Sequence, residues 1–151
     1  MPSSLATGNN WVVMKMTRDE VMKMTDEELQ IQAAELLGWT NISNVRLMVG
    51  GKDITMRPNW QGRTPDGVYE LIPLPDFPTN MTAAIGLSDS IQDRYWMELK
   101  SPFEPGCQWF AGFTPIGTTG WNGIPDNQMP GTVPARAITR AFILAMKENH
   151  E

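Results

Sequence analysis

Five prolines between Pro58 and Pro78 restrict the fold of this chain more than any other feature. Proline breaks a helix interior and cannot donate a hydrogen bond to a β-ladder, so this stretch has room only for a short strand over residues 68–72. The edges of this stretch are expected to be loops. With 151 residues in total, the chain has room for one folded domain with a single core.

Two helix-start signals precede the prolines. Thr17 and Thr25 are each followed three residues later by a glutamate, which matches the capping box. Beyond Thr25, apolar residues recur at spacings of three and four as far as Leu37, and Gly38 stands where a left-handed C-terminal cap is needed. The pattern predicts an amphipathic helix that ends near Leu37.

Two hairpins are expected in the middle of the chain. Gly50 and Gly51 can adopt the positive φ angles of a type I′ turn, which would join strands over residues 45–49 and 54–57. Aromatic residues are concentrated in 95–100 and 108–114, and the prolines and glycine between these runs predict a second hairpin with a longer connection. Strands joined in this way pair antiparallel.

Two further helices flank the second hairpin. The apolar spacing of residues 81–87, capped by Thr79 or Asn80, predicts a short helix. Pro134 fits the first turn of a last helix, along which alanine, isoleucine and leucine recur at helical spacing. We therefore predict an α+β fold in which helices from both ends of the chain cover the two faces of an antiparallel sheet, an α/β/α sandwich. Residues 1–16 are an N-terminal lead, and residues 17–151 form the single domain.

Charge and composition exclude several classes of protein. A formal net charge of -5 argues against binding of duplex nucleic acid, which needs a basic face. No stretch approaches the roughly eighteen consecutive apolar residues of a membrane span, so we expect a cytoplasmic protein that binds no membrane. One cysteine and one histidine cannot supply a disulfide or a zinc or iron-sulfur site, and no metal or cofactor is expected.

Catalysis by a nucleophile is also disfavoured. The sole histidine, His150, lies next to the C-terminus, where fraying is expected. Cys107 is expected to be a buried and inert thiol. An enzyme would have to rely on carboxylates alone, and these are scattered along the chain. We therefore expect that the protein is not an enzyme.

The segment from Pro115 to Gly131 is the first candidate for a binding site. Its seventeen residues include four glycines, three prolines and one charged residue. Loops of this length inside a compact domain are usually functional or disordered, and Trp121 argues against disorder because an exposed indole is unfavourable. A binding loop and a structural loop folded on the core both remain open.

Arg136 and Arg140 are the second candidate. They are four residues apart and so project from one face of the last helix, near its N-terminal turn, which favours anions. Two guanidinium groups at this spacing can hold phosphates through bidentate hydrogen bonds. The alternative is a solvated pair on a helix surface. In both interpretations the side chains are exposed, so alanine substitutions should change stability by less than about 0.5 kcal/mol.

Trp109, Phe110 and Phe113 are the third candidate, as a platform on which a base could stack. Aromatic residues in a strand also commonly form a core, and this alternative stays open. Strand alternation places Phe110 on the face opposite to Trp109 and Phe113. Only one of the two sets can therefore belong to the core of a sheet that is buried on one side.

Several segments together resemble the phage ABA-sandwich domain family. They are MTDEELQIQAAELLGW at residues 24–39, LPDFPTNMTAAIGL at 74–87, the aromatic strand QWFAGF, the glycine-rich loop, and the terminal helix TVPARAITRAFILAMKE at 132–148. The part that is least covered is residues 42–69. Members are small proteins of bacteriophages and prophages with helices on either side of an antiparallel sheet, and the resemblance implies the same layers here.

Within this family the chain is similar to the first described class of Thoeris anti-defence proteins, which sequester glycocyclic ADP-ribose, and in some members cyclic oligonucleotides, without cleaving them. The resemblance implies a homo-oligomer, a dimer or a hexamer, in the cytoplasm of an infected or lysogenic bacterial host. It also implies a ligand site built from a strand aromatic, a loop asparagine and the two helix arginines. The ligand-binding candidates are Trp109, Phe110, Thr119, Trp121, Asn122, Arg136 and Arg140.

Three functions compete at this point. The leading hypothesis is an anti-defence protein that sequesters a nucleotide immune signal. The alternative is a phage accessory module that blocks or bridges a host protein through exposed aromatic residues. A hydrolase or transferase that uses carboxylates alone is the third. Six tryptophans and eleven methionines exceed what a core of this size readily hides, which also predicts a homo-oligomer.

Overall fold

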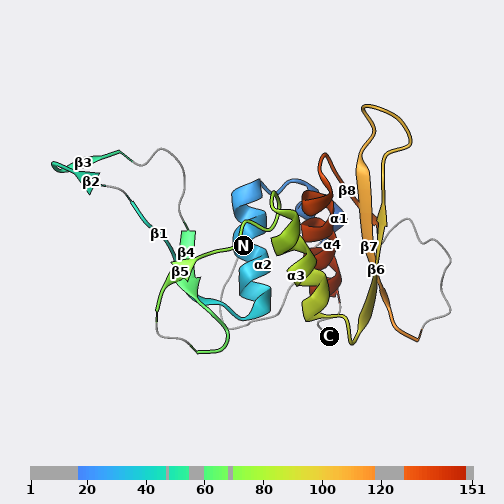
Figure 1. Ribbon diagram of the computed structural model, residues 1–151, viewed down its shortest axis with the longest axis horizontal. Helices are drawn as coiled ribbons and strands as arrows, with labels where there is room; N and C mark the ends of the chain where they lie inside the picture. Colours follow the sequence, from blue (N-terminus) through green and yellow to red (C-terminus); the bar gives the residue numbers. More distant parts are fainter. Residues whose placement is uncertain (1–16, 47, 55–59, 68–69, 118–127, 149–151) are drawn as a thin grey trace.

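The computed structural model describes residues 17–46, 48–54, 60–67, 70–117 and 128–148. It confirms the α+β class, because helices are combined with antiparallel sheets (Figure 1). The helices in this part of the chain are α1 (Arg18–Met22), α2 (Asp26–Leu37), α3 (Met81–Ser90) and α4 (Pro134–Glu148). The strands of this part form three sheets. The first contains β1 (Thr40–Asn44), β4 (Trp60–Arg63) and β5 (Ile72–Pro73), and the second is the hairpin of β2 (Met48–Val49) and β3 (Lys52–Asp53). The third contains β6 (Tyr95–Lys100), β7 (Trp109–Pro115) and β8 (Gln128–Gly131).

The starts of α1, α2 and α3 and the end of α2 form as the sequence predicts, and the end of α3 does not. Both capping boxes are present, and at α2 the Thr25 hydroxyl accepts from the Glu28 amide at 3.1 Å while the Glu28 carboxylate accepts from the Thr25 amide at 2.9 Å. Gly38 ends α2 with a φ of 101°, in the left-handed region. Asn80 caps α3, which continues to Ser90 and is longer than expected.

The centre of the molecule is α4. Its residues from Ala137 to Ala145 are all buried except Arg140, which is partly exposed. This helix is apolar on nearly every side, so it needs cover from helices as well as from a sheet. It packs against β7 and β8 and also against α1, α2 and α3.

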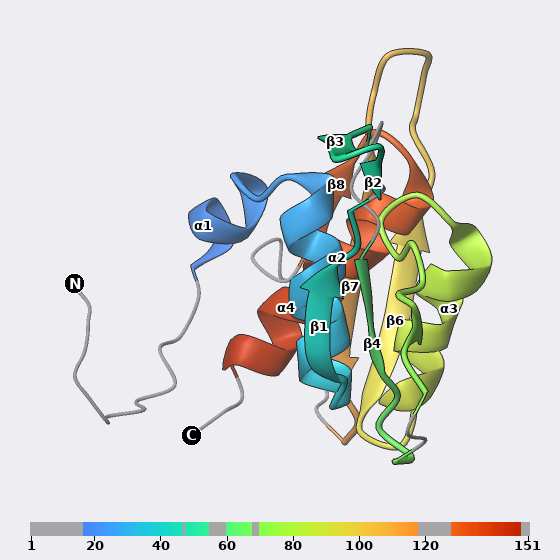
Figure 2. The ribbon, with the colours of Figure 1, turned by 90° about the vertical axis from the view of Figure 1, so that its left-hand side faces the viewer.

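The layers differ from the expected sandwich. The described helices lie together on one face of the sheet β6-β7-β8, and the sheet β1-β4-β5 lies on the other side of the helices (Figures 1 and 2). The helices therefore do not divide between the two faces of one sheet. The cause is α4, which gathers the other helices around itself because its apolar surface is not limited to the side that faces the sheet.

The sheet β6-β7-β8 has one covered and one open face. Ala111 and Phe113 of β7 are buried on the face that α4 covers. Phe110 has the opposite orientation and lies across from Lys100 of β6. Trp96 shares this open face and is 56% exposed. The open face is thus the one large surface of this sheet that no described helix protects.

The region before α3 departs most from the sequence prediction. The expected strand over 68–72 is wrong, because β5 begins only at Ile72, and residues 68–69 lie outside the described part. β1 and β4 were not expected at all. The hairpin at Gly50 and Gly51 is present with φ angles of 58° and 80°, but β2 covers only the last two residues of the first predicted strand. β3 lies at Lys52–Asp53, before the predicted second strand over 54–57, and Ile54 is not in a strand. Residues 55–57 of the second predicted strand lie outside the described residues.

The connection between β6 and β7 projects beyond the helices (Figure 2). It contains Cys107, which is exposed, so the prediction of a buried thiol is wrong. The chain turns at Gly106, which has a φ of 92° and directly precedes Cys107. Among the described helices, none combines the length and the apolar character that crossing a membrane requires.

Candidate functional site

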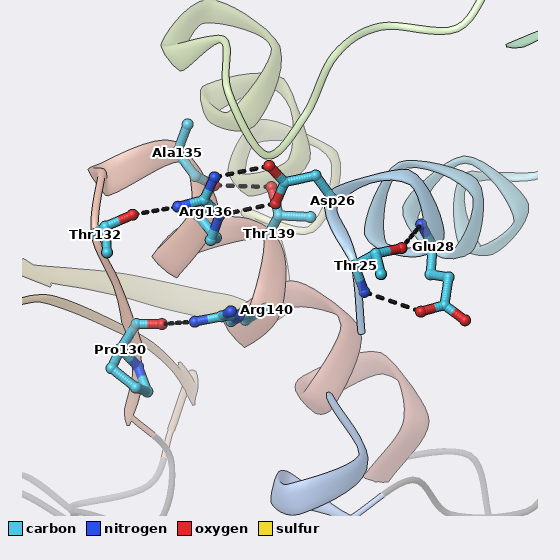
Figure 3. Close-up of polar contacts among 9 residues, drawn as sticks. All are labelled: Thr25, Asp26, Glu28, Pro130, Thr132, Ala135, Arg136, Thr139 and Arg140. Atoms are coloured by element: carbon cyan, nitrogen blue, oxygen red, sulfur yellow. Dashed lines mark hydrogen bonds and ion pairs between the residues drawn. The ribbon is translucent and has the colours of Figure 1, made fainter. Parts of the chain in front are cut away.

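The site is built where β8 runs directly into α4. A side chain at Gly131 would place its Cβ 2.5 Å from the backbone nitrogen of Ala137. Because the clashing atom belongs to the backbone, no change of side-chain rotamer can relieve the clash. Glycine therefore lets the end of β8 lie against the first turns of α4. This close approach places Pro130 and Thr132 beside Arg140 and Arg136 (Figure 3).

Arg136 is committed to a contact within the protein. Its Nε donates to Asp26 Oδ1 at 2.8 Å, its Nη2 donates to Asp26 Oδ2 at 2.7 Å, and its Nη1 donates to the Thr132 hydroxyl. The side chain is 21% exposed and that of Asp26 is 44% exposed. This bidentate pair joins α4 to the first turn of α2, so the side chain of Arg136, which was expected to be exposed, is instead a bridge between helices.

The titration of these groups follows from the same contacts. The hydrogen bonds from Arg136 hold the pKa of Asp26 below its usual value, and they raise the pKa of Arg136. Burial lowers the pKa of Arg140, and the neighbouring Arg136 charge lowers it further. The three groups, which we call the arginine cluster (Asp26, Arg136 and Arg140), carry two positive charges against one negative charge.

Arg140 is the member of this cluster whose charge has no direct carboxylate partner in the part of the chain that the structure describes. Its Nη1 donates to the backbone carbonyl of Pro130 at 2.7 Å. Its Nε is buried and has no hydrogen-bond partner among the described residues. A buried donor without a partner lowers the free energy of unfolding by about 1–3 kcal/mol. In native proteins such groups commonly contact a water, an ion or a ligand.

The aromatic candidates are distributed over both faces of the sheet. Trp109 lies opposite Gly131 on the helix-covered face, where it is half-buried and packs against the core. Phe113 is buried, with its ring 6.3 Å from that of Tyr95 and 6.5 Å from that of Phe142 in edge-to-face contacts. Phe113 therefore belongs to the core, and Phe110 is the aromatic residue of β7 on the open face.

The three remaining candidates share one outcome, and Thr139 lies near the arginines without having been a candidate. Thr119, Trp121 and Asn122 lie outside the described residues, between β7 and β8, so their roles stay predictions. Thr139, between the two arginines in sequence, is buried and donates to the Ala135 carbonyl at 2.8 Å. Its hydroxyl satisfies the helix backbone and is not presented to a ligand.

Sequence reasoning missed Asp26. Its only signal is its place in the acidic first turn of α2, which stabilises the helix dipole and predicts no partner 110 residues away. It also missed that the Trp60 indole donates to the Glu27 carboxylate, which joins β4 to the same turn of α2. The described residues contain no group of three or more histidine, cysteine, aspartate or glutamate side chains arranged to hold a metal ion.

Comparison with known proteins gives no match. No protein-family model, no curated protein and no solved structure is similar enough to this chain to be counted.

Proposed function

We propose that this protein binds a small phosphorylated nucleotide, of the cyclic ADP-ribose or cyclic oligonucleotide type, and sequesters it without cleaving it. The resemblance of residues 24–39, 74–87 and 132–148 to the phage ABA-sandwich family supports this class of ligand. The observation that carries the proposal is the guanidinium of Arg140, which within the described ranges has no direct carboxylate partner and keeps a buried Nε donor that no described group accepts from. Its function would be to remove a nucleotide immune signal in a phage-infected bacterial cell.

The two arginines have different roles in this proposal. Arg140 contacts a phosphate through the donors that Pro130 does not use. Arg136 is a positioning residue, because Asp26 and Thr132 already occupy its three nitrogens. Asn122 and Trp121 would complete the site from the segment between β7 and β8, with Thr119 as a further hydroxyl donor.

Titration calorimetry with glycocyclic ADP-ribose, and separately with a cyclic oligonucleotide, tests the proposal. Arg140→Ala should weaken binding by tenfold or more, since a hydrogen bond to a charged group is worth about 1.5–3 kcal/mol. Arg140→Lys should restore only part of the affinity because lysine lacks the planar fork. Arg46→Ala is the matched control, since it removes the same charge from an exposed side chain that precedes β2 and contacts Asp53. The proposal would be rejected if the wild type binds neither of the two nucleotides.

The fate of the ligand separates sequestration from catalysis. After incubation, the nucleotide is released by heating and identified by mass spectrometry. An unchanged mass supports sequestration, and a processed nucleotide would show that the protein is an enzyme.

A protein-interaction module is the second candidate, and exposed aromatic side chains favour it. Phe103 in the β6–β7 connection is 100% exposed, and Trp96 is largely exposed on the open sheet face. Aromatic anchors of this kind are common at protein interfaces. If neither nucleotide binds, capture of a host protein that is lost with Phe103→Ser would favour this function.

A further inference from the structure

β6 is an edge strand of the sheet β6-β7-β8, and no described strand pairs with its other side. The direction of its backbone groups follows from two hydrogen bonds. The Ile116 amide donates to the Arg94 carbonyl at 2.9 Å, which makes residue 94 one of the positions that bond to β7. The Pro130 carbonyl of β8 accepts from Arg140 and therefore faces away from β7. Because Pro130 lies opposite Phe110, the backbone groups of Phe110 are directed toward β6, which agrees with the pattern set by residue 94.

This alternation determines which residues of β6 face outward. Positions 96, 98 and 100 direct their amides and carbonyls toward β7, since they are separated from Arg94 by even numbers of residues. Met97 and Leu99 therefore direct theirs to the free edge. An unpaired edge of this kind is a template for another strand.

The side chains of β6 are complementary to those of a second, antiparallel β6. Glu98 and Lys100 lie on the open face with opposite charges, two residues apart. Met97 and Leu99 lie on the helix-covered face, where they are only half-buried. The free edge thus combines outward amides with a charge pair and incompletely covered apolar side chains.

We propose that β6 pairs antiparallel with β6 of a second copy of this chain, about a two-fold axis at Leu99. Leu99 then lies opposite itself in a hydrogen-bonded pair, and Glu98 lies opposite the partner subunit's Lys100 on both sides of the axis. The two sheets join into one continuous sheet of six strands. The proposal uses none of the arginine cluster and stands independently of nucleotide binding.

Charge selects this register over its neighbours. With the axis at Glu98, two glutamates lie directly opposite each other, which is destabilising. With the axis at Met97, Arg94 lies opposite the partner subunit's Lys100, which also brings like charges together. Only the register at Leu99 places each charge of β6 against its opposite.

Sedimentation velocity of the full chain tests the proposal. The wild type should form a weak dimer with a micromolar Kd, because a short strand pair makes a small interface. Glu98→Lys creates two like-charge pairs and should raise Kd about tenfold. The double variant Glu98→Lys with Lys100→Glu restores both pairs and should return Kd to the wild-type value. Glu70→Lys is the control, with the same change of charge at an exposed position away from β6.

Disulfide trapping tests the register directly. In a Cys107→Ser background, Leu99→Cys places two cysteines opposite each other with Cα atoms about 5.5 Å apart, within the range of a disulfide. Oxidation should therefore yield a covalent dimer. Met97→Cys should not, because its opposite residue is the partner subunit's Ser101. A covalent dimer through Met97→Cys alone would refute the register.

Two further outcomes would overturn the proposal. A wild-type monomer at about 100 μM would refute the pairing with a second copy. A dimer whose Kd is the same in Glu98→Lys and in the double variant as in the wild type would show that the chain associates through another surface.

Discussion

Replacing Arg136 with alanine is expected to destabilise the fold, in contrast to the behaviour of a solvated arginine. The substitution removes two charge-assisted hydrogen bonds, of 2.8 and 2.7 Å, between α4 and α2. Such bonds contribute about 1.5–3 kcal/mol when shielded. Asp26 is 44% exposed, so solvent screens the pair and rehydrates the carboxylate that is left behind. We expect a loss of about 1–2 kcal/mol, several times the roughly 0.5 kcal/mol of a surface substitution.

A double-mutant cycle isolates the pair. Urea unfolding of the wild type, Asp26→Ala, Arg136→Ala and the double variant gives the coupling energy between the two residues. We expect a coupling of about 1 kcal/mol or more, so that the double variant loses less stability than the two single variants lose in sum. A coupling below about 0.3 kcal/mol would refute it, since that is within the error of additivity for unconnected sites.

The same cycle has a defined pH dependence. The pKa of Asp26 is lower in the folded state than in the unfolded chain, where it is about 3.9. The stability that the pair contributes is therefore fully present above that value and is lost as pH falls through the folded-state pKa. The coupling energy should be constant between about pH 6 and 8 and should shrink below about pH 4.

Three further substitutions or reactions have expected outcomes. Gly131→Ala should cost about 2 kcal/mol or more in thermal or urea unfolding, because its Cβ would lie 2.5 Å from the Ala137 backbone nitrogen, and an unchanged melting curve would contradict this geometry. Gly86→Ala should raise stability by about 0.5–1 kcal/mol, since its Cβ meets nothing within 4 Å in the helix α3, and a lower melting temperature would show that the site is not open. Cys107 should react with a thiol reagent in the native protein as fast as after denaturation, and protection in the native state would contradict its exposure.

Local chemistry explains which elements the sequence could predict. The two ends of α2 and the start of α3 depend on Thr25, Gly38 and Asn80, whose effects act within a few residues. Thr25 and Gly38 were predicted, and Asn80 was one of the two predicted caps. β1 and β4 were missed because they are short, partly exposed and lack a clear alternation of apolar and polar residues. Their pairing depends on contacts made after the chain has folded.

The candidate site shows the same division. The spacing of Arg136 and Arg140 correctly placed both side chains on one face of a helix. It could not show that α4 is buried on almost every side, because burial depends on how many elements pack against a helix. The partner Asp26 is 110 residues away in sequence, and no local pattern reports such a pair.

The central position of α4 also affects the order in which this protein can fold. A ribosome synthesises α4 after every described element that packs on it, from α1 to β8. Until residues 134–148 emerge, the apolar surfaces of α2, α3 and β7 that pack on α4 in the folded protein stay uncovered in the nascent chain. The domain is therefore expected to acquire its native structure in one late step, when the last helix inserts between layers that are already synthesised.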